Sequence, residues 1–89
     1  MTVQREVLIS NKLGLHLRAA GRLVDVAKKY SADIRIRKDQ KEVDGKSIME
    51  VMTLGATTGT PILLLADGQD AAEAIASIES LVKNKFDEE

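Results

Sequence analysis

The chain contains one histidine, His16, and its neighbours suit it to handling an anion. A neutral imidazole, the prevailing form near pH 7, can attack an electrophile with a ring nitrogen. Helical spacing begins at Leu17, and the first N–H groups of a helix lack partners and favour an anion. The positive charge of Arg18 is unfavourable near the positive end of the helix dipole, but its guanidinium fits phosphate oxygens. Gly14 can fold the loop back over this point. If an anion is handled here, the most suitable one is a phosphoryl group carried on the imidazole itself.

These residues alone nevertheless favour another interpretation of His16. A lone histidine before a helix more often simply caps that helix, because short motifs of this size often occur by chance. Zinc binding has less support, because the chain has no second histidine and no cysteine to complete a site. We therefore expect neither a metal nor a cofactor.

Ser47 is the second polar position of interest. Ser47 followed by Glu50 three residues later fits a capping box, and Gly55 is placed to stop the helix that this cap would start. A hydroxyl at a helix start is also a favourable phosphate acceptor, because the free N–H groups there stabilise added charge. Ser47 is thus a predicted helix cap, and regulatory phosphorylation is a second interpretation.

Hydrophobic periodicity predicts the elements that must position these residues. Pro61 would start a continuous apolar run, typical of a central, well-buried strand. Asp70 would cap the last helix, and the tail 87–89 would fray. In chain order we expect a strand at 2–9, a helix at 17–30, strands at 32–38 and 42–45, a short helix within 46–55, a strand at 60–66 and a helix at 70–86.

This order indicates a single α+β domain over residues 1–89, with one sheet and helices on one face. A ferredoxin-like split βαβ arrangement has the same order of elements, so the pattern does not choose the sheet order. With one Phe, one Tyr, no Trp and a net charge of −1, a nucleic-acid module is disfavoured. We expect no disulfide, no signal peptide and no membrane span.

Two motifs together resemble a known family. "GLHLRAA" at 14–20 resembles the active-site segment of the HPr phosphocarrier family of the bacterial phosphoenolpyruvate-dependent phosphotransferase system. "KSIMEVMTLGATTGT" at 46–60 resembles that family's segment around its regulatory serine. The resemblance implies an open-faced β-sandwich of order βαββαβα, in which a four-stranded antiparallel sheet of order 1-4-2-3 carries three helices on one face.

The same resemblance implies a role in a cytoplasmic phosphoryl relay. His16 would accept a phosphoryl group on Nδ1 from phosphorylated enzyme I and donate it to an enzyme IIA domain, with Arg18 stabilising the phosphate. Ser47 would be the target of a serine kinase and phosphorylase. The alternative is a regulatory binding module of a nitrogen-type or permease-less branch, which signals through its phosphorylation state.

The chain departs from the family where Ala, Arg and Pro usually follow the histidine. Leu17 adds an apolar group there, and Ala19 restores a backbone N–H that proline lacks. Met49 lies off the helical stripe that Ile48 begins, so we expect it to be exposed, whereas Met52 stays open between exposure and core packing. The predicted docking patch for partners consists of Leu17, Ala20, Ile48, Met49 and Met52.

Overall fold

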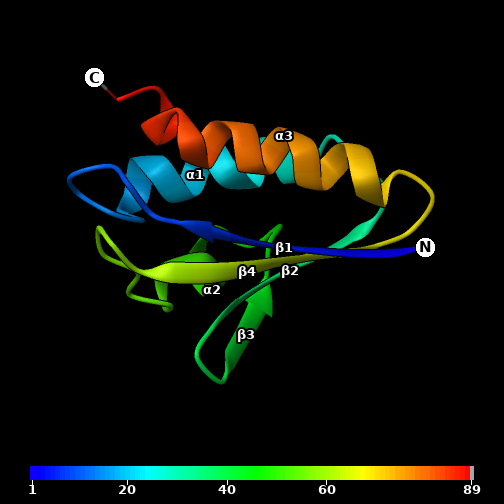
Figure 1. Ribbon diagram of the computed structural model, residues 1–89, viewed down its shortest axis with the longest axis horizontal. Coiled ribbons are helices and arrows are strands. Elements are labelled where there is room, and N and C mark those ends of the chain that lie inside the picture. The colour runs from blue at the N-terminus through cyan, green and yellow to red at the C-terminus, as the bar shows by residue number, and fades with distance from the viewer. Residues whose placement is uncertain (89) are drawn as a thin grey trace.

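The computed structural model describes residues 1–88 and has the predicted order of elements (Figure 1). Four strands form one antiparallel sheet in the order β1-β4-β2-β3, as the family resemblance implied and as the pattern alone could not decide. The elements are β1 (Thr2–Leu8), α1 (Leu17–Ala27), β2 (Asp33–Lys38), β3 (Lys41–Asp44), α2 (Ile48–Met52), β4 (Pro61–Asp67), α3 (Ala71–Lys83) and the 3-10 turn η1 (Lys85–Asp87).

Strand β4 lies in the interior of the sheet, between β1 and β2. Its side chains alternate: Ile62 and Leu64 are buried in the core, whereas Leu63 and Leu65 on the other face are only half-buried. The apolar run correctly indicated a central strand, but the prediction that it is well buried holds for one face only. The helices cover that face and leave the other open, so the sheet is half of a two-layer structure.

Helix α1 ends three residues earlier than predicted. Lys28 is its C-cap, and Lys29 and Tyr30 follow in tight turns, with their N–H groups bonded three residues back to Val26 and Ala27. Tyr30 instead reaches α3, where its hydroxyl lies 2.5 Å from Oγ of Ser77. The predicted helix 17–30 is therefore wrong for its last three residues, which form the C-cap and the turns that follow it.

Helix α3 and the tail also differ from the prediction. The helix ends at Lys83, and Lys85, Phe86 and Asp87 all adopt positive φ angles between 57° and 62°. Left-handed backbone costs about 1–2 kcal/mol for each such residue, so tertiary contacts must hold it. Phe86 is fully buried, and the Arg22 guanidinium donates a hydrogen bond to its carbonyl. The tail is therefore packed as far as residue 88, contrary to the predicted fraying of residues 87–89. Residue 89 lies outside the described residues.

Asp70 occupies the N-cap position of α3, but its side chain makes no cap hydrogen bond. Its carboxylate instead accepts hydrogen bonds from the backbone N–H groups of Ser31 and Ala32, each at 2.9 Å. These bonds, with that from Ser31 first, lower the pKa of Asp70. The prediction that Asp70 caps α3 is thus wrong for its side chain. The carboxylate instead connects the end of the α1–β2 loop to the start of α3.

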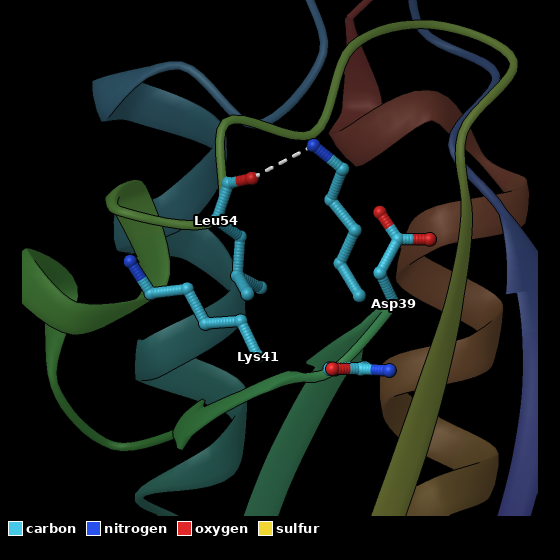
Figure 2. A pocket seen from close by; sticks show the side chains of 5 residues that line it. Asp39, Lys41 and Leu54 are labelled. Atoms are coloured by element: carbon cyan, nitrogen blue, oxygen red, sulfur yellow. Dashed lines mark hydrogen bonds between the residues drawn. The ribbon is translucent and has the colours of Figure 1, made fainter.

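The β2–β3 hairpin holds the end of α2 in place (Figure 2). Nζ of Lys38 donates to the carbonyl of Leu54 at 3.1 Å, the bond drawn as a dashed line, and Nζ of Lys41 donates to the carbonyl of Thr53 at 3.1 Å. Both ammonium groups thus satisfy carbonyls at a helix C-terminus. They line a hollow of about 550 Å³ with Asp39 and Gln40, which shares no residue with the hollow at His16 described below.

Candidate functional site

His16 is the N-cap residue of α1, and its backbone is extended. Its carbonyl accepts the first intrahelical hydrogen bond, from the N–H of Ala20 at 2.8 Å. The N–H groups of residues 17–19 therefore precede the hydrogen-bond ladder, as expected of any first turn. The imidazole forms no cap hydrogen bond, so His16 occupies the N-cap position without capping the helix through its side chain.

The loop before His16 is pressed against the segment that leads into β4. Gly14 has a φ of +69°, and a Cβ atom there would lie 2.4 Å from the carbonyl oxygen of Ala56. The next N–H, that of Leu15, donates to the same carbonyl at 2.9 Å. Only glycine combines this backbone conformation with such close approach. Gly14 thus shapes the loop that brings His16 to the start of α1.

The imidazole contacts the chain's other end. Nε2 of His16 is hydrogen-bonded to a carboxylate oxygen of Glu88, and within the described chain it is the ring nitrogen that has a partner. This bond is the main cause that lowers the pKa of Glu88, followed by a bond from Asn11 and the charge of Arg18. The carboxylate is therefore ionised near neutral pH and accepts a hydrogen bond from the Nε2–H group, which leaves Nδ1 as the nitrogen with a free lone pair.

The buried side chain of Asn11 stabilises this arrangement through two hydrogen bonds. Its amide nitrogen donates to the carbonyl of Gly14 at 2.7 Å and to the second carboxylate oxygen of Glu88 at 3.1 Å. The Asn11 side chain is 1% exposed. Its Oδ1 has no hydrogen-bond partner within residues 1–88, so both hydrogen bonds of this side chain are donated by its amide nitrogen. One buried amide thus connects the loop before His16 with the tail that touches His16.

A hollow of about 640 Å³ opens beside the imidazole. Three of its charged side chains are cations and one is an anion. The surplus of positive charge, together with the free N–H groups of the first helical turn, favours a bound or covalently attached anion. Arg18, a residue predicted for this role, is exposed and lines the hollow. The lining residues are Ser10, Lys12, Leu13, His16, Arg18, Lys85 and Glu88.

The predicted docking patch is exposed except at one position. Leu17 is 64% exposed and Met49 81% exposed, whereas Met52 and Ile48 are exposed to 40% and 37%. Ala20 is fully buried and makes no surface, so its predicted role in docking is wrong. The reason is helical phase: Ala20 lies three residues after Leu17 but on the side of α1 that faces the core.

Ser47 is the N-cap of α2, as predicted. Its Oγ accepts a hydrogen bond from the N–H of Glu50 at 3.3 Å. The reciprocal half of the capping box is absent from this part of the described structure, because the Glu50 carboxylate accepts from the N–H of Asp44 at 2.9 Å. Gly55, with a φ of +61°, reverses the chain three residues after α2 ends.

Sequence reasoning missed Asn11 and Glu88. Asn11 lies between the predicted strand at 2–9 and the predicted helix at 17–30, where no functional residue before Gly14 is predicted, and Glu88 lies in the tail that is predicted to fray. One signal could have found the second: Phe86 is the only phenylalanine of the chain, and a large apolar residue next to the acidic end indicates a packed tail. No local pattern indicates that Asn11 and Glu88 meet, since 77 residues separate them.

Comparison of the sequence and the structure with known proteins identifies the family of this chain. The sequence model described as the phosphorylation site of the HPr component of the phosphotransferase system matches residues 3–84. The chain belongs to the HPr family. The phosphocarrier protein HPr of Pseudomonas aeruginosa is 46% identical to this chain over 84 residues, which are 93% of each of the two chains. The crystal structure of HPr-C-His from Thermoanaerobacter tengcongensis superposes with a TM-score of 0.94 at 42% identity, covering 98% of both chains.

As an HPr-family protein, the chain is a phosphocarrier of the phosphotransferase system. Among residues 1–88, no helix is long and apolar enough to cross a membrane. The same residues contain no group of three or more His, Cys, Asp or Glu side chains arranged to hold a metal ion.

Proposed function

We propose that the protein carries its phosphoryl group on Nδ1 of His16, which receives it from phosphorylated enzyme I and donates it to an enzyme IIA domain. One observation supports this assignment most directly: the imidazole lies at the N-terminus of α1 with Nε2 paired to Glu88 and Nδ1 unpaired within the described chain. The relay starts from phosphoenolpyruvate, a cytoplasmic metabolite, so we place the protein in the cytoplasm. Residues 1–89 act as a single domain.

The surroundings of His16 supply the charge that a phosphoryl group needs. Arg18 lies in the first turn of α1 and lines the hollow beside the imidazole. Its guanidinium can bind phosphate oxygens, and the unpaired N–H groups of the same turn add dipoles of the right sign. These groups are in place before the phosphoryl group arrives, so they stabilise the adduct with little rearrangement.

Exposed apolar side chains of α1 and α2, two helices in contact with each other, form the proposed docking surface for both partners. Met49 and Leu17 are the most exposed members of this patch, and Leu13, which lines the hollow at His16, is 68% exposed. Flexible methionine side chains adapt to different partners, as a carrier that binds a donor and an acceptor in turn requires. Ile48 and Met52 complete the surface.

Ser47 is the proposed site of regulation by a serine kinase and phosphorylase. Its hydroxyl caps α2, directly before the exposed residues Ile48 and Met49. A phosphate there would add about −1.5 to −2 charges at the edge of the docking surface. The added charge would hinder the approach of enzyme I, so phosphorylation of Ser47 would reduce phosphorylation of His16.

The decisive experiment compares the wild type with His16→Ala in the presence of phosphoenolpyruvate and purified cognate enzyme I. We expect the wild type to form an acid-labile, base-stable phosphoryl adduct that the variant cannot form. A folded wild-type protein that takes up no phosphoryl group would overturn the proposal.

A second function has one specific observation in its favour. The phosphocarrier protein NPr of Shewanella violacea is 42% identical over 86 residues, covering 97% of this chain and 94% of that protein. This similarity supports a regulatory role in a nitrogen-type branch, in which the phosphorylated state itself is the signal. Faster transfer to a nitrogen-type than to a sugar-type IIA domain would favour this role.

A further inference from the structure

We infer that Glu88 is a positioning residue for phosphoryl transfer: its carboxylate holds the proton on Nε2 of His16, so that Nδ1 is the nucleophile and the phosphorylated ring keeps its positive charge. The chemistry in this inference rests on the proposed function. The evidence for it is the contact between the Glu88 carboxylate and Nε2 of His16.

The carboxylate is fixed in place rather than loosely extended. Three consecutive residues before it adopt the left-handed conformation, which is unfavourable for a residue that is not glycine. Buried Phe86 and its carbonyl's bond from Arg22 hold this turn. Strain maintained beside a reactive group points to a functional requirement. The result is that the Glu88 side chain is only 16% exposed.

Three groups form a chain of hydrogen bonds: the Asn11 amide donates to Glu88, and Glu88 accepts from His16. A reactive group, a partner that orients it and a third group that orients the partner are the usual parts of an activated nucleophile. Here the imidazole is the reactive group. The buried Asn11 amide fixes the carboxylate, and the carboxylate fixes both the ring orientation and its tautomer.

The transfer step explains why the Nε2 proton matters. When His16 accepts a phosphoryl group, the lone pair of Nδ1 forms the N–P bond, and the bond from phosphorus to the donor atom breaks with its electrons leaving on the donor. The Nε2 proton stays, and the ring becomes positively charged. In donation a nucleophilic atom of the IIA domain uses its lone pair to form a bond to phosphorus as the N–P bond breaks. The electron pair of the broken bond returns to Nδ1, and the leaving group is a neutral imidazole rather than an imidazolate anion.

Glu88 is suited to stabilise the charged ring because it is the one acid among the hollow's described lining residues. The other charged groups that face the imidazole are Lys12, Arg18 and Lys85, all cations. They favour the phosphate but disfavour a positive ring. An opposite charge at hydrogen-bonding distance favours the charged form of a group by a factor of about ten or more. The carboxylate and the cations therefore serve different parts of the same adduct.

The test uses nitrogen NMR of the uniformly labelled protein, in which the single histidine gives unambiguous ring signals. We expect the unphosphorylated wild type to carry its proton on Nε2 and Glu88→Ala to show a mixture of both tautomers. Glu88→Gln keeps a hydrogen-bond acceptor but loses the charge, so we expect it to keep the tautomer and to transfer its phosphoryl group to a IIA domain about tenfold more slowly. Glu88→Asp should restore part of the rate.

The matched control is Asp87→Asn, which removes the same charge from the exposed neighbouring side chain and should match the wild type in both readouts. A proton on Nδ1 in the wild type, or equal transfer by Glu88→Gln and Asp87→Asn, would overturn the inference. The tautomer is measured without any phosphoryl donor. A wild type that shows the expected tautomer but takes up no phosphoryl group would therefore contradict the proposed function and leave the positioning contact established.

Discussion

Arg22 of α1 donates a hydrogen bond to the backbone carbonyl of Phe86, 64 residues further along the chain. With the burial of the Phe86 ring, this bond closes the tail over the start of α1. We expect Phe86→Ala to lower the free energy of unfolding by about 3–5 kcal/mol, because it leaves a cavity in the core. Urea unfolding followed by circular dichroism measures the change.

Phe86→Leu is the control for this prediction. It retains most of the apolar volume and should cost clearly less than Phe86→Ala. Equal stabilities of Phe86→Ala and the wild type would mean that the tail does not pack on the core in solution.

Asp70 predicts a pH dependence of stability. The hydrogen bonds from Ser31 and Ala32 lower its pKa in the folded state below the unfolded value. A carboxyl group whose pKa is lowered by folding contributes stability above its unfolded pKa, and this contribution is lost as the pH falls through the folded pKa. We therefore expect Asp70→Asn to be less stable than the wild type at pH 7, with the difference shrinking as the pH falls below about 4.

The measurement is a series of urea unfolding curves from pH 7 to pH 2.5 for both proteins. Asp67→Asn serves as a control, because its side chain is largely exposed at the end of β4. A difference between Asp70→Asn and the wild type that is the same at every pH would contradict the assignment of the effect to the charge of Asp70.

Ser47 separates a structural from a regulatory effect. Ser47→Ala removes the acceptor for the N–H of Glu50 and should lower the free energy of unfolding by about 1 kcal/mol. Ser47→Asp keeps a good cap, so it should preserve stability while slowing phosphorylation of His16 by enzyme I. Rates of phosphoryl uptake provide the second readout, and wild-type rates for Ser47→Asp would argue against interference at the docking surface.

Met49 tests the docking surface without disturbing the fold. Its side chain is 81% exposed, so Met49→Gln should leave stability within about 0.5 kcal/mol of the wild type. We expect the same substitution to raise the concentration of protein that half-saturates enzyme I several-fold. Leu8→Gln is the matched control, because Leu8 is 60% exposed but lies on β1, outside the proposed surface. Equal kinetics for both variants would refute the role of Met49.

Ala19 tests the departure from the usual proline. It stands in the first turn of α1, before the first N–H that has an intrahelical partner, and its side chain is fully buried. Its N–H either adds to the donors around the phosphate or loosens the helix start. Ala19→Pro removes that N–H and fixes φ, so it should change the hydrolysis rate of the phosphorylated protein. An unchanged rate would show that neither effect operates.

The local pattern determined the elements of this protein and the place of two of its functional residues. Alternation and helical spacing are properties of neighbouring residues, so they predicted the order of strands and helices, the position of His16 before α1 and the Ser47 cap of α2. The sheet order needed the family resemblance, because the same order of elements suits more than one sheet.

Only the tertiary structure decided what happens between distant parts of the chain. In the tertiary structure Ala20 lies in the core, and the Asp70 carboxylate accepts a hydrogen bond from Ser31. Glu88 contacts His16, which is 72 residues away in the chain. None of these contacts has a local signature, since each depends on how one element rotates or packs against another. A left-handed turn of three residues that are not glycine is locally unfavourable, so no propensity could predict it. The burial of Phe86 and the bond from Arg22 offset that local cost, and this is why the tail closes on the histidine.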